Sequence, residues 1–314
     1  YTSNPQSYFL GGSAIVQNYS GAGESEAIFG QFSYRFAEDW SITLGARSTE
    51  EDKEGFKEYV GIISASGEGS FDDTTSTFIL EHDYSENTNI YFKVAEGFKA
   101  GGFNAESSNP FAASTPYAPE TIESTELGLK GRYLDNRMML NIAYFDNEHE
   151  DMQISYFNAD AAAASEVINQ SASISGLEIE SMTLLNDSTV LTLNFSTLDA
   201  EATGNVVAQD GFLVNNIPYS PEKTLYASLE KDFGSYRVRL DHTRVDEHAS
   251  FPYNSQDFRT ELTYIDTNSK TDLLVLTEPM ENLQLNFWVR NLNNNYHKSS
   301  AISFGPGFGY LTVG

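Results

Sequence analysis

Apolar and polar residues alternate along most of the chain, and this period of two predicts β-strands. In one segment, for example, Leu191, Leu193 and Phe195 are separated by single polar residues. The same alternation recurs at 40–47, 126–133, 138–144, 236–241 and 283–290. Such a strand has one face suited to hydrocarbon and one suited to water. The run 271–277 departs from the alternation, and we expect that strand to be covered on both faces.

The connections between the predicted strands alternate between short and long. The short ones are rich in Asp, Asn, Gly and Ser, as tight hairpin turns are. They lie at 37–39, 85–88, 134–136, 186–188, 233–235 and 279–282. The long ones lie near 48–74, 99–121, 146–166, 199–220, 245–257 and 293–306. This division predicts about thirteen strands, near 25–36, 40–50, 75–84, 88–98, 122–133, 137–147, 167–184, 188–199, 222–232, 236–246, 258–277, 283–293 and 306–314.

The pattern favours an all-β, transmembrane antiparallel β-barrel. A soluble β-sandwich is the alternative, but its outward residues are not repeatedly Leu, Phe, Tyr and Val with Arg and Glu pointing inward. An apolar exterior around a polar interior is stable only in lipid. Outer-membrane barrels also have short periplasmic turns and longer extracellular loops. No stretch approaches the roughly 18 consecutive apolar residues of a spanning helix, so a helical membrane protein is excluded.

The strand count predicts that the chain is a partial barrel, one domain over 1–314. A complete bacterial single-chain barrel has an even number of strands, whereas this count is odd and its first strand runs inward from the outside. We therefore expect earlier strands before Tyr1. We also expect a few further residues after Gly314, ending in an aromatic ring such as outer-membrane barrels usually carry.

Composition and charge exclude several classes of protein. The net charge of −27 argues against a nucleic-acid partner, because such proteins neutralise phosphates with Lys and Arg. Cysteine is absent, which rules out disulfides, thiolate metal sites and cysteine nucleophiles in this sequence. Aromatic residues make up 13% of a chain whose mean hydropathy is −0.38, a combination that suits strands with one apolar and one polar face.

Five segments resemble the barrel landmarks of TonB-dependent outer-membrane receptors, in the family's order. They read YFKVAEGFKAGGFN at 91–104, YAPET at 117–121, ELGLK at 126–130, GLEIE at 176–180 and RNLNNNY at 290–296. The resemblance implies a barrel of 22 strands whose lumen is closed by an N-terminal plug domain. We find neither the plug nor the TonB box in this sequence, so we expect both, with about nine strands, upstream of Tyr1.

The resemblance further implies active uptake of a scarce nutrient across the outer membrane of a Gram-negative bacterium. The nutrient could be a ferric siderophore, haem, cobalamin or an oligosaccharide. The implied partners are the TonB–ExbB–ExbD complex, reached through the plug, the lipid and lipopolysaccharide of the outer membrane, and a small-molecule ligand such as a metal chelate or glycan. We predict no cofactor. The alternatives are a passive porin or adhesin, and an outer-membrane hydrolase using Ser299 or Ser300 with His297.

The candidate ligand-binding residues are Phe98, Phe103, Tyr117, Arg47 and Arg290. Phe98 and Phe103 adjoin glycines that allow a strand to bend at the barrel rim, but they could instead pack a loop or an aromatic girdle. The arginines belong to a set of inward charges that could line a binding site or bond to the plug. This set is Arg47, Arg132, Arg237, Arg239, Arg290, Glu126, Glu178 and Glu180.

Two further groups of residues are interpreted as structural. Aromatic residues beside the short turns are expected to form a belt at the periplasmic membrane surface: Tyr34, Phe36, Trp40, Tyr84, Tyr133 and Phe233. The five histidines are scattered without zinc-ligand spacing, so we assign no metal site and expect most of them to be solvated. The acidic segments near 50–54 and 148–151 are likewise expected to be solvated surface.

Overall fold

The computed structural model describes residues 2–10, 13–59, 63–105, 107, 113–158, 164–207, 213–252, 264–303 and 310–313. Thirteen strands form one sheet in the order β1 to β11, then β14 and β15, and each neighbouring pair is antiparallel. The pairs β12–β13 and β16–β17 form two small separate sheets. No helix in these ranges is long and apolar enough to cross a membrane.

The strands have the following bounds. They are β1 (Thr2–Leu10), β2 (Ser13–Arg35), β3 (Trp40–Tyr59), β4 (Ile63–Ser85), β5 (Thr88–Lys99), β6 (Glu120–Tyr133), β7 (Met138–Asn158), β8 (Ala164–Asn186), β9 (Thr189–Ala202), β10 (Lys223–Asp232), β11 (Tyr236–Val245), β12 (His248–Ala249), β13 (Tyr264–Ile265), β14 (Asn268–Met280), β15 (Leu283–Val289), β16 (Ser300–Ser303) and β17 (Tyr310–Val313).

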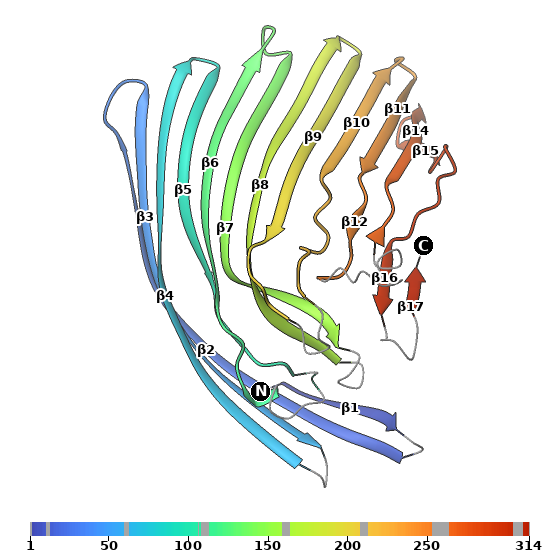
Figure 1. Cartoon of the computed structure of the whole chain (residues 1–314). Helices are drawn as coiled ribbons and strands as arrows, with labels where there is room; N and C mark the ends of the chain where they lie inside the picture. The colour runs from blue at the N-terminus through green and yellow to red at the C-terminus, as the bar shows by residue number, and fades with distance from the viewer. Residues whose placement is uncertain are drawn as a thin grey trace.

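The sheet curves, and its two ends differ (Figure 1). At the upper end in this view, which we call the short-turn end, tight turns join β2 to β3, β4 to β5 and so on to β14 and β15. Gly234 at the β10–β11 turn has a φ of 86°, a conformation that glycine adopts without steric cost. At the opposite end, which we call the long-strand end, the hairpins β3–β4 and β7–β8 extend well beyond β5 and β6. The predicted tight turns are therefore confirmed, and all of them lie at one end of the sheet.

Two predicted loops are strands instead. Most of 48–74 and 146–166 continues the hairpins β3–β4 and β7–β8, with Asp52 paired to Ser70 and Ser155 paired to Val167. The prediction failed because these segments lack alternating apolar residues, whereas a backbone hydrogen-bond ladder requires no particular side chain.

The strand count of thirteen is right for the large sheet, but its membership differs from the prediction. β1 was not predicted and lies at one edge of the sheet. The predicted last strand, 306–314, corresponds to β17, which pairs with β16 outside the large sheet, and 304–309 lie outside the described residues. The predicted strand 258–277 includes β13 and most of β14, with 258–263 outside the described residues.

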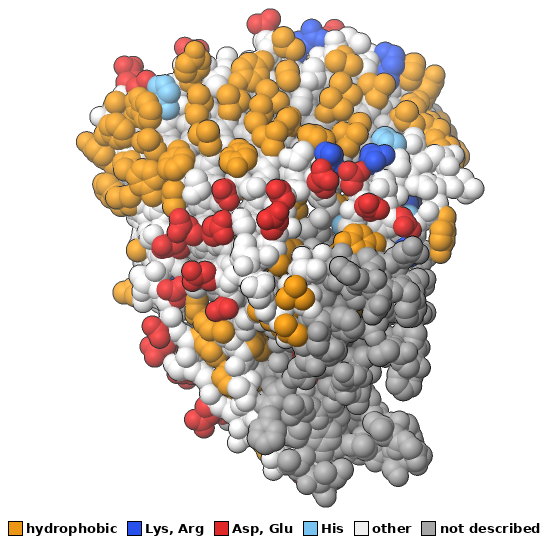
Figure 2. All heavy atoms as spheres, in the orientation of Figure 1, with side chains coloured by type: hydrophobic (Ala, Val, Ile, Leu, Met, Phe, Trp, Pro, Cys, Tyr) orange, Lys and Arg blue, Asp and Glu red, His pale blue; other side chains and the backbone are white. Residues whose placement is uncertain are grey.

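Cross-strand register separates an apolar face from a polar face. Directly paired residues point to the same side of a sheet, and Phe32, Leu44, Phe78 and Val94 are paired in succession across β2 to β5. Large apolar side chains are correspondingly exposed on this face, among them Leu127, Leu193, Leu240 and Phe287. Figure 2 shows them as a broad band over the half of the molecule next to the short turns, with acidic side chains beyond it.

Aromatic residues concentrate where the apolar face meets the short turns, as predicted. Trp40 stacks on His82 with ring centroids 4.3 Å apart, and Phe233 stacks on Tyr236 at 4.8 Å. Tyr84 is 70% exposed. This arrangement is typical of an aromatic belt at a membrane surface.

The opposite face carries the charges that were predicted to point inward. Arg237 and Arg239 alternate with Val238 along β11, and Glu178 and Glu180 alternate in the same way on β8. The run of apolar residues in β14 also divides between the faces: Leu273 and Val275 belong to the apolar face, whereas Leu274 and Leu276 line a pocket on the polar face.

Candidate functional site

The segment that joins β5 to β6 folds onto the polar face of its neighbours. We call it the 100–119 loop, of which 106 and 108–112 lie outside the described residues. Because β5 and β6 end early, the loop occupies the space between the long hairpins β3–β4 and β7–β8. Its ends pair through Gly102 and Tyr117, with the Tyr117 N–H donating to the Gly102 carbonyl at 2.8 Å.

Glycines on β3 and β4 allow the loop to lie close to the sheet. A Cβ atom at Gly67 would lie 2.0 Å from the carbonyl oxygen of Ser114 and 2.6 Å from the ring of Phe103. At Gly55 it would lie 2.9 Å from the same ring. Since real Cβ contacts are never this short, any side chain at these positions would displace the loop.

Two lysines of β3 hold the first half of the loop. The Lys53 ammonium donates to the Gly101 carbonyl at 2.9 Å. Lys57 is 1% exposed and donates to the carbonyls of Ala105 at 2.6 Å and Ser107 at 2.5 Å. Buried carbonyls without a donor are costly, so these lysines stabilise the docked loop.

Amide side chains hold the loop on its other side, against β7 and β8. Asn169 accepts from the Ala118 N–H at 2.9 Å and donates to the Ala118 carbonyl at 3.0 Å. Asn104 of the loop pairs in the same two-way manner with the backbone of Val167. Gln153 donates to the carbonyls of Ala100 at 3.0 Å and Ala118 at 3.1 Å. The loop is thus a fixed bridge between the two long hairpins.

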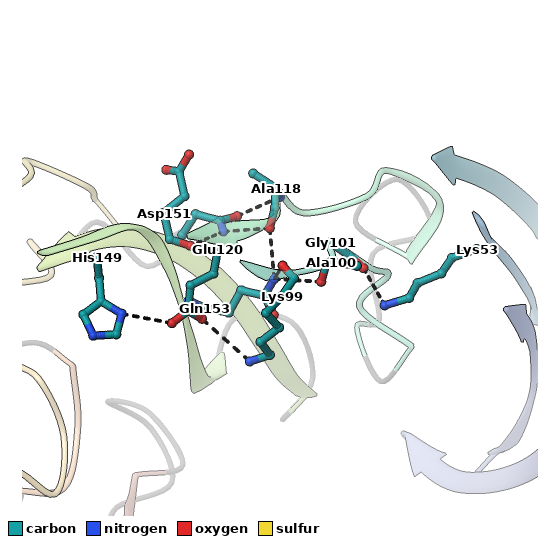
Figure 3. A network of polar contacts seen from close by, with 10 residues as sticks. Lys53, Lys99, Ala100, Gly101, Ala118, Glu120, His149, Asp151 and Gln153 are labelled. Atoms are coloured by element: carbon teal, nitrogen blue, oxygen red, sulfur yellow. Dashed lines mark hydrogen bonds and ion pairs between the residues drawn. The ribbon is translucent and has the colours of Figure 1, made fainter. Parts of the chain in front are cut away.

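Glu120, at the point where the loop enters β6, joins this network (Figure 3). Its carboxylate accepts a hydrogen bond from the backbone N–H of Gln153 at 3.0 Å. It also lies 3.2 Å from His149 Nδ1 and 3.8 Å from the Lys99 ammonium. A bulge between His149 and Met152 presents that N–H. The His149 side chain is only 12% exposed, so the expectation of a solvated residue was wrong for this histidine.

The phenol groups of Tyr19 and Tyr117 lie close together at the long-strand end. Burial raises the pKa of Tyr117, and burial together with the neighbouring Tyr117 raises the pKa of Tyr19. Both phenols therefore stay protonated at neutral pH and can donate hydrogen bonds.

The structure brings together only two of the five candidate ligand-binding residues, Phe103 and Tyr117 of the loop. Phe98 is paired with Thr121 and belongs to the register of the apolar face, so it does not join them. Arg47 is exposed on the polar face of β3, 5.9 Å above the Phe29 ring. Arg290 directly follows β15, the last strand of the large sheet, and is therefore far from the loop.

Arg290 lines a pocket of about 660 Å³ on the polar face of β11, β14 and β15. Its polar members are Arg239, Asp241, Lys270, Asp272, Asn286, Arg290 and Asn291, and its apolar members include Leu274, Leu276 and Trp288. A second pocket on the same face, about 300 Å³, is lined by Glu178, Glu180 and Asn194. The two pockets have opposite dominant charges. Within the described ranges, no group of three or more His, Asp and Glu side chains is arranged to hold a metal ion.

Sequence reasoning missed the residues that dock the loop. Lys53 was assigned to a solvated acidic segment and Lys57 to the long connection 48–74, although their spacing of four places both on the same face of a strand. That spacing was the available signal. No local sequence pattern identifies Gln153 or Asn169, because their partner in the loop, Ala118, is more than 30 residues away.

Comparison with known proteins identifies the family of this chain. The family "TonB dependent receptor-like, beta-barrel" matches residues 1–292. Among solved structures, the ferric yersiniabactin uptake receptor FyuA from Yersinia pestis is 17% identical with a TM-score of 0.80, over 98% of this chain and 46% of that one.

Two further structures are similar. The siderophore receptor PiuA from Acinetobacter baumannii is 16% identical, with a TM-score of 0.75, over 95% of this chain and 43% of that one. The ferric-catecholate import receptor Fiu from E. coli K12 is 17% identical, with a TM-score of 0.70, over 95% and 44%. At these identities the similarity shows the fold, and the chain spans less than half the length of each of these three proteins.

Proposed function

Because the chain belongs to the TonB-dependent receptor family, whose members are outer-membrane proteins of Gram-negative bacteria, we propose that it takes part in TonB-dependent uptake of a scarce nutrient. Its apolar face contacts lipid and its polar face lines the lumen of the barrel. The short-turn end is periplasmic and the long-strand end is extracellular, as in other outer-membrane barrels.

The observation that carries the proposal is the docked 100–119 loop. Two lysines, two asparagines and a glutamine hold it on the lumen side of the extracellular half, where a ligand arriving from outside would first meet the protein. A passive pore has no need of so many contacts across its entrance, whereas a receptor requires a surface of fixed shape. Phe103 and Tyr117 are positioned by this loop.

A ferric siderophore is the nutrient we propose first. PiuA is described as a siderophore receptor, Fiu as a ferric-catecholate import receptor and FyuA as a ferric yersiniabactin uptake receptor. Haem, cobalamin and an oligosaccharide are the remaining candidates. We further propose that a plug domain fills the lumen and connects the barrel to TonB, ExbB and ExbD. The lumen-facing charges Glu126, Glu178 and Arg237 would then contact the plug.

Uptake by the intact protein tests the proposal. The full-length protein is expressed in cells lacking their own iron receptors, and uptake of iron-55 siderophores, haem and cobalt-57 cobalamin is compared with and without TonB. We expect uptake of one class of probe that requires TonB. Diffusion of all probes without TonB would favour a passive pore and contradict the proposal.

A further inference from the structure

Some cations on the polar face have an acidic partner and others do not. Arg237 lies 3.4 Å from Glu230, and Lys53 lies 2.8 Å from Glu51. Lys270 and Arg290, in contrast, make no ion pair with any residue that the structure describes. In a chain with a net charge of −27, two such cations in one pocket require an explanation.

The two carboxylates of the pocket already have donors. Asp241 accepts from Arg239 at 2.9 Å and from the Tyr226 hydroxyl at 3.0 Å. Asp272 accepts from the Asn291 N–H at 2.7 Å. These contacts fix the carboxylates as parts of the wall, and the pocket contains three cations for two carboxylates.

The apolar part of the pocket is an open surface for a ring. Trp288 is 63% exposed although it points to the polar face, and Leu274 and Leu276 lie beside it. An indole face attracts flat rings and sugar rings, and burying it against one would remove apolar surface from water. The volume of about 660 Å³ is within the range of small-molecule sites, roughly 300–1,000 Å³.

The backbone that carries Arg290 is fixed by an asparagine corner. Asn293 accepts from the Thr271 N–H at 3.0 Å and donates to the Ser269 carbonyl at 2.5 Å. Asn295 donates to the same carbonyl at 3.0 Å. The corner anchors the end of β15 to β14, so Arg290 is presented to the pocket from a rigid support.

We propose that this pocket binds an anionic group of the transported ligand, with an adjoining ring on Trp288. Arg290 and Lys270 would contact a carboxylate, phenolate or phosphate, for which a guanidinium fork and an ammonium group are well suited. The inference rests on the proposed function, whose ligand it describes: a ring-bearing anion rather than a neutral or cationic molecule.

Cysteine labelling tests the pocket independently of transport. The described chain contains no cysteine, so Trp288→Cys in the full-length protein, with any other cysteine replaced, is a unique label site. Intact cells are treated with an anionic (sulfonatoethyl) and a cationic (trimethylammonioethyl) methanethiosulfonate. We expect the anionic reagent to react roughly three- to tenfold faster relative to a free thiol, and Arg290→Gln or Lys270→Gln to remove this preference.

Asn194→Cys, beside Glu178 and Glu180, is the matched control and should prefer the cationic reagent. The same preference at both positions, or a preference unchanged by Arg290→Gln and Lys270→Gln, would overturn the proposal. So would complete protection of Trp288→Cys, because the pocket would then be covered by another part of the protein.

Equilibrium binding extends the test to ligands. The probes are an anionic ferric complex of 2,3-dihydroxybenzoate and a neutral ferric trihydroxamate, added to the detergent-solubilised full-length protein. We expect Arg290→Gln to weaken binding of the anionic probe roughly ten- to hundredfold and to leave any binding of the neutral probe unchanged. Tighter binding of the neutral probe, or an anionic probe insensitive to Arg290→Gln, contradicts the pocket. Absence of any TonB-dependent uptake overturns the proposed function instead, and the labelling result still decides the charge of the pocket.

Discussion

The two ends of the same strands are stabilised in different ways. Near the short turns, β3 alternates apolar residues such as Ile42 and Leu44 with polar ones, and the apolar band faces lipid. Beyond residue 49 the strand is largely polar, with Phe56 as its main apolar residue, yet it continues to Tyr59. There the stabilising contacts come from the 100–119 loop, through Lys53 and Lys57. The barrel wall thus extends past the apolar band where a loop docked on its polar face supplies the stabilising contacts.

The largest expected effect is a loss of stability in the half of the sheet that carries the apolar band. Leu193 is exposed on the apolar face, and its neighbour Asn194 points to the other face. Leu193→Arg places a charge in lipid at a cost of about 2–4 kcal/mol, whereas Asn194→Arg should be tolerated. Urea titration of the full-length protein in bilayers, followed by heat-modifiable gel mobility, measures the difference. Equal stability of the two variants would show that the faces are wrongly assigned.

The next largest effect is expected at the long-strand end alone, where the 100–119 loop docks. Gly67→Val pushes a side chain into the Ser114 carbonyl and the Phe103 ring, and should loosen the docked loop by roughly 1–3 kcal/mol. Gly30→Val is the control, because a Cβ atom added at Gly30 would have no neighbour within 4 Å. Limited proteolysis of the folded protein should cut the loop faster in Gly67→Val only. If the cutting rate is unchanged, the loop is not docked as described.

A smaller effect is expected at the start of β6. Glu120→Gln removes the charge that lies between His149 and Lys99, at a cost of about 1 kcal/mol to loop docking. Glu123→Gln, an exposed position on the same strand, is the control. The backbone N–H of Gln153 donates to Glu120, so its hydrogen-exchange rate reports the loosening of the loop. Protection of that amide should fall in Glu120→Gln and stay constant in Glu123→Gln.

The smallest effect is a pH dependence beside the proposed anion pocket. Burial first, and then the nearby Lys270 cation, lower the pKa of His297. The folded state therefore favours the neutral imidazole, and the unfolded chain takes up the proton first as pH falls below about 6.5. The contribution of this residue to stability is thus lost progressively below that pH.

Histidine NMR of the full-length protein in micelles measures this titration, with His297→Gln identifying the resonance. We expect a midpoint below about 6.5, which Lys270→Met should move upward. A midpoint that does not respond to Lys270→Met would show that Lys270 does not lie close to His297.

The sequence by itself determined the barrel wall and its two faces. Alternation such as that of Leu191, Leu193 and Phe195 records which side of a strand meets lipid, because burial depends on each residue's own chemistry. Turn positions such as Gly234 follow from local backbone preference. The family segments at 91–104 and 290–296 then indicated which kind of barrel this is.

Only the tertiary structure decided what the polar segments do. Lys57 and Asn169 bind backbone groups distant in the sequence, and any lysine or asparagine could make such bonds. Arg290, Lys270 and Trp288 form one pocket because β11, β14 and β15 are adjacent, which no local pattern specifies. Apolar periodicity is a property of each strand alone, whereas hydrogen bonds and ion pairs need a partner that the fold must first bring within about 3 Å.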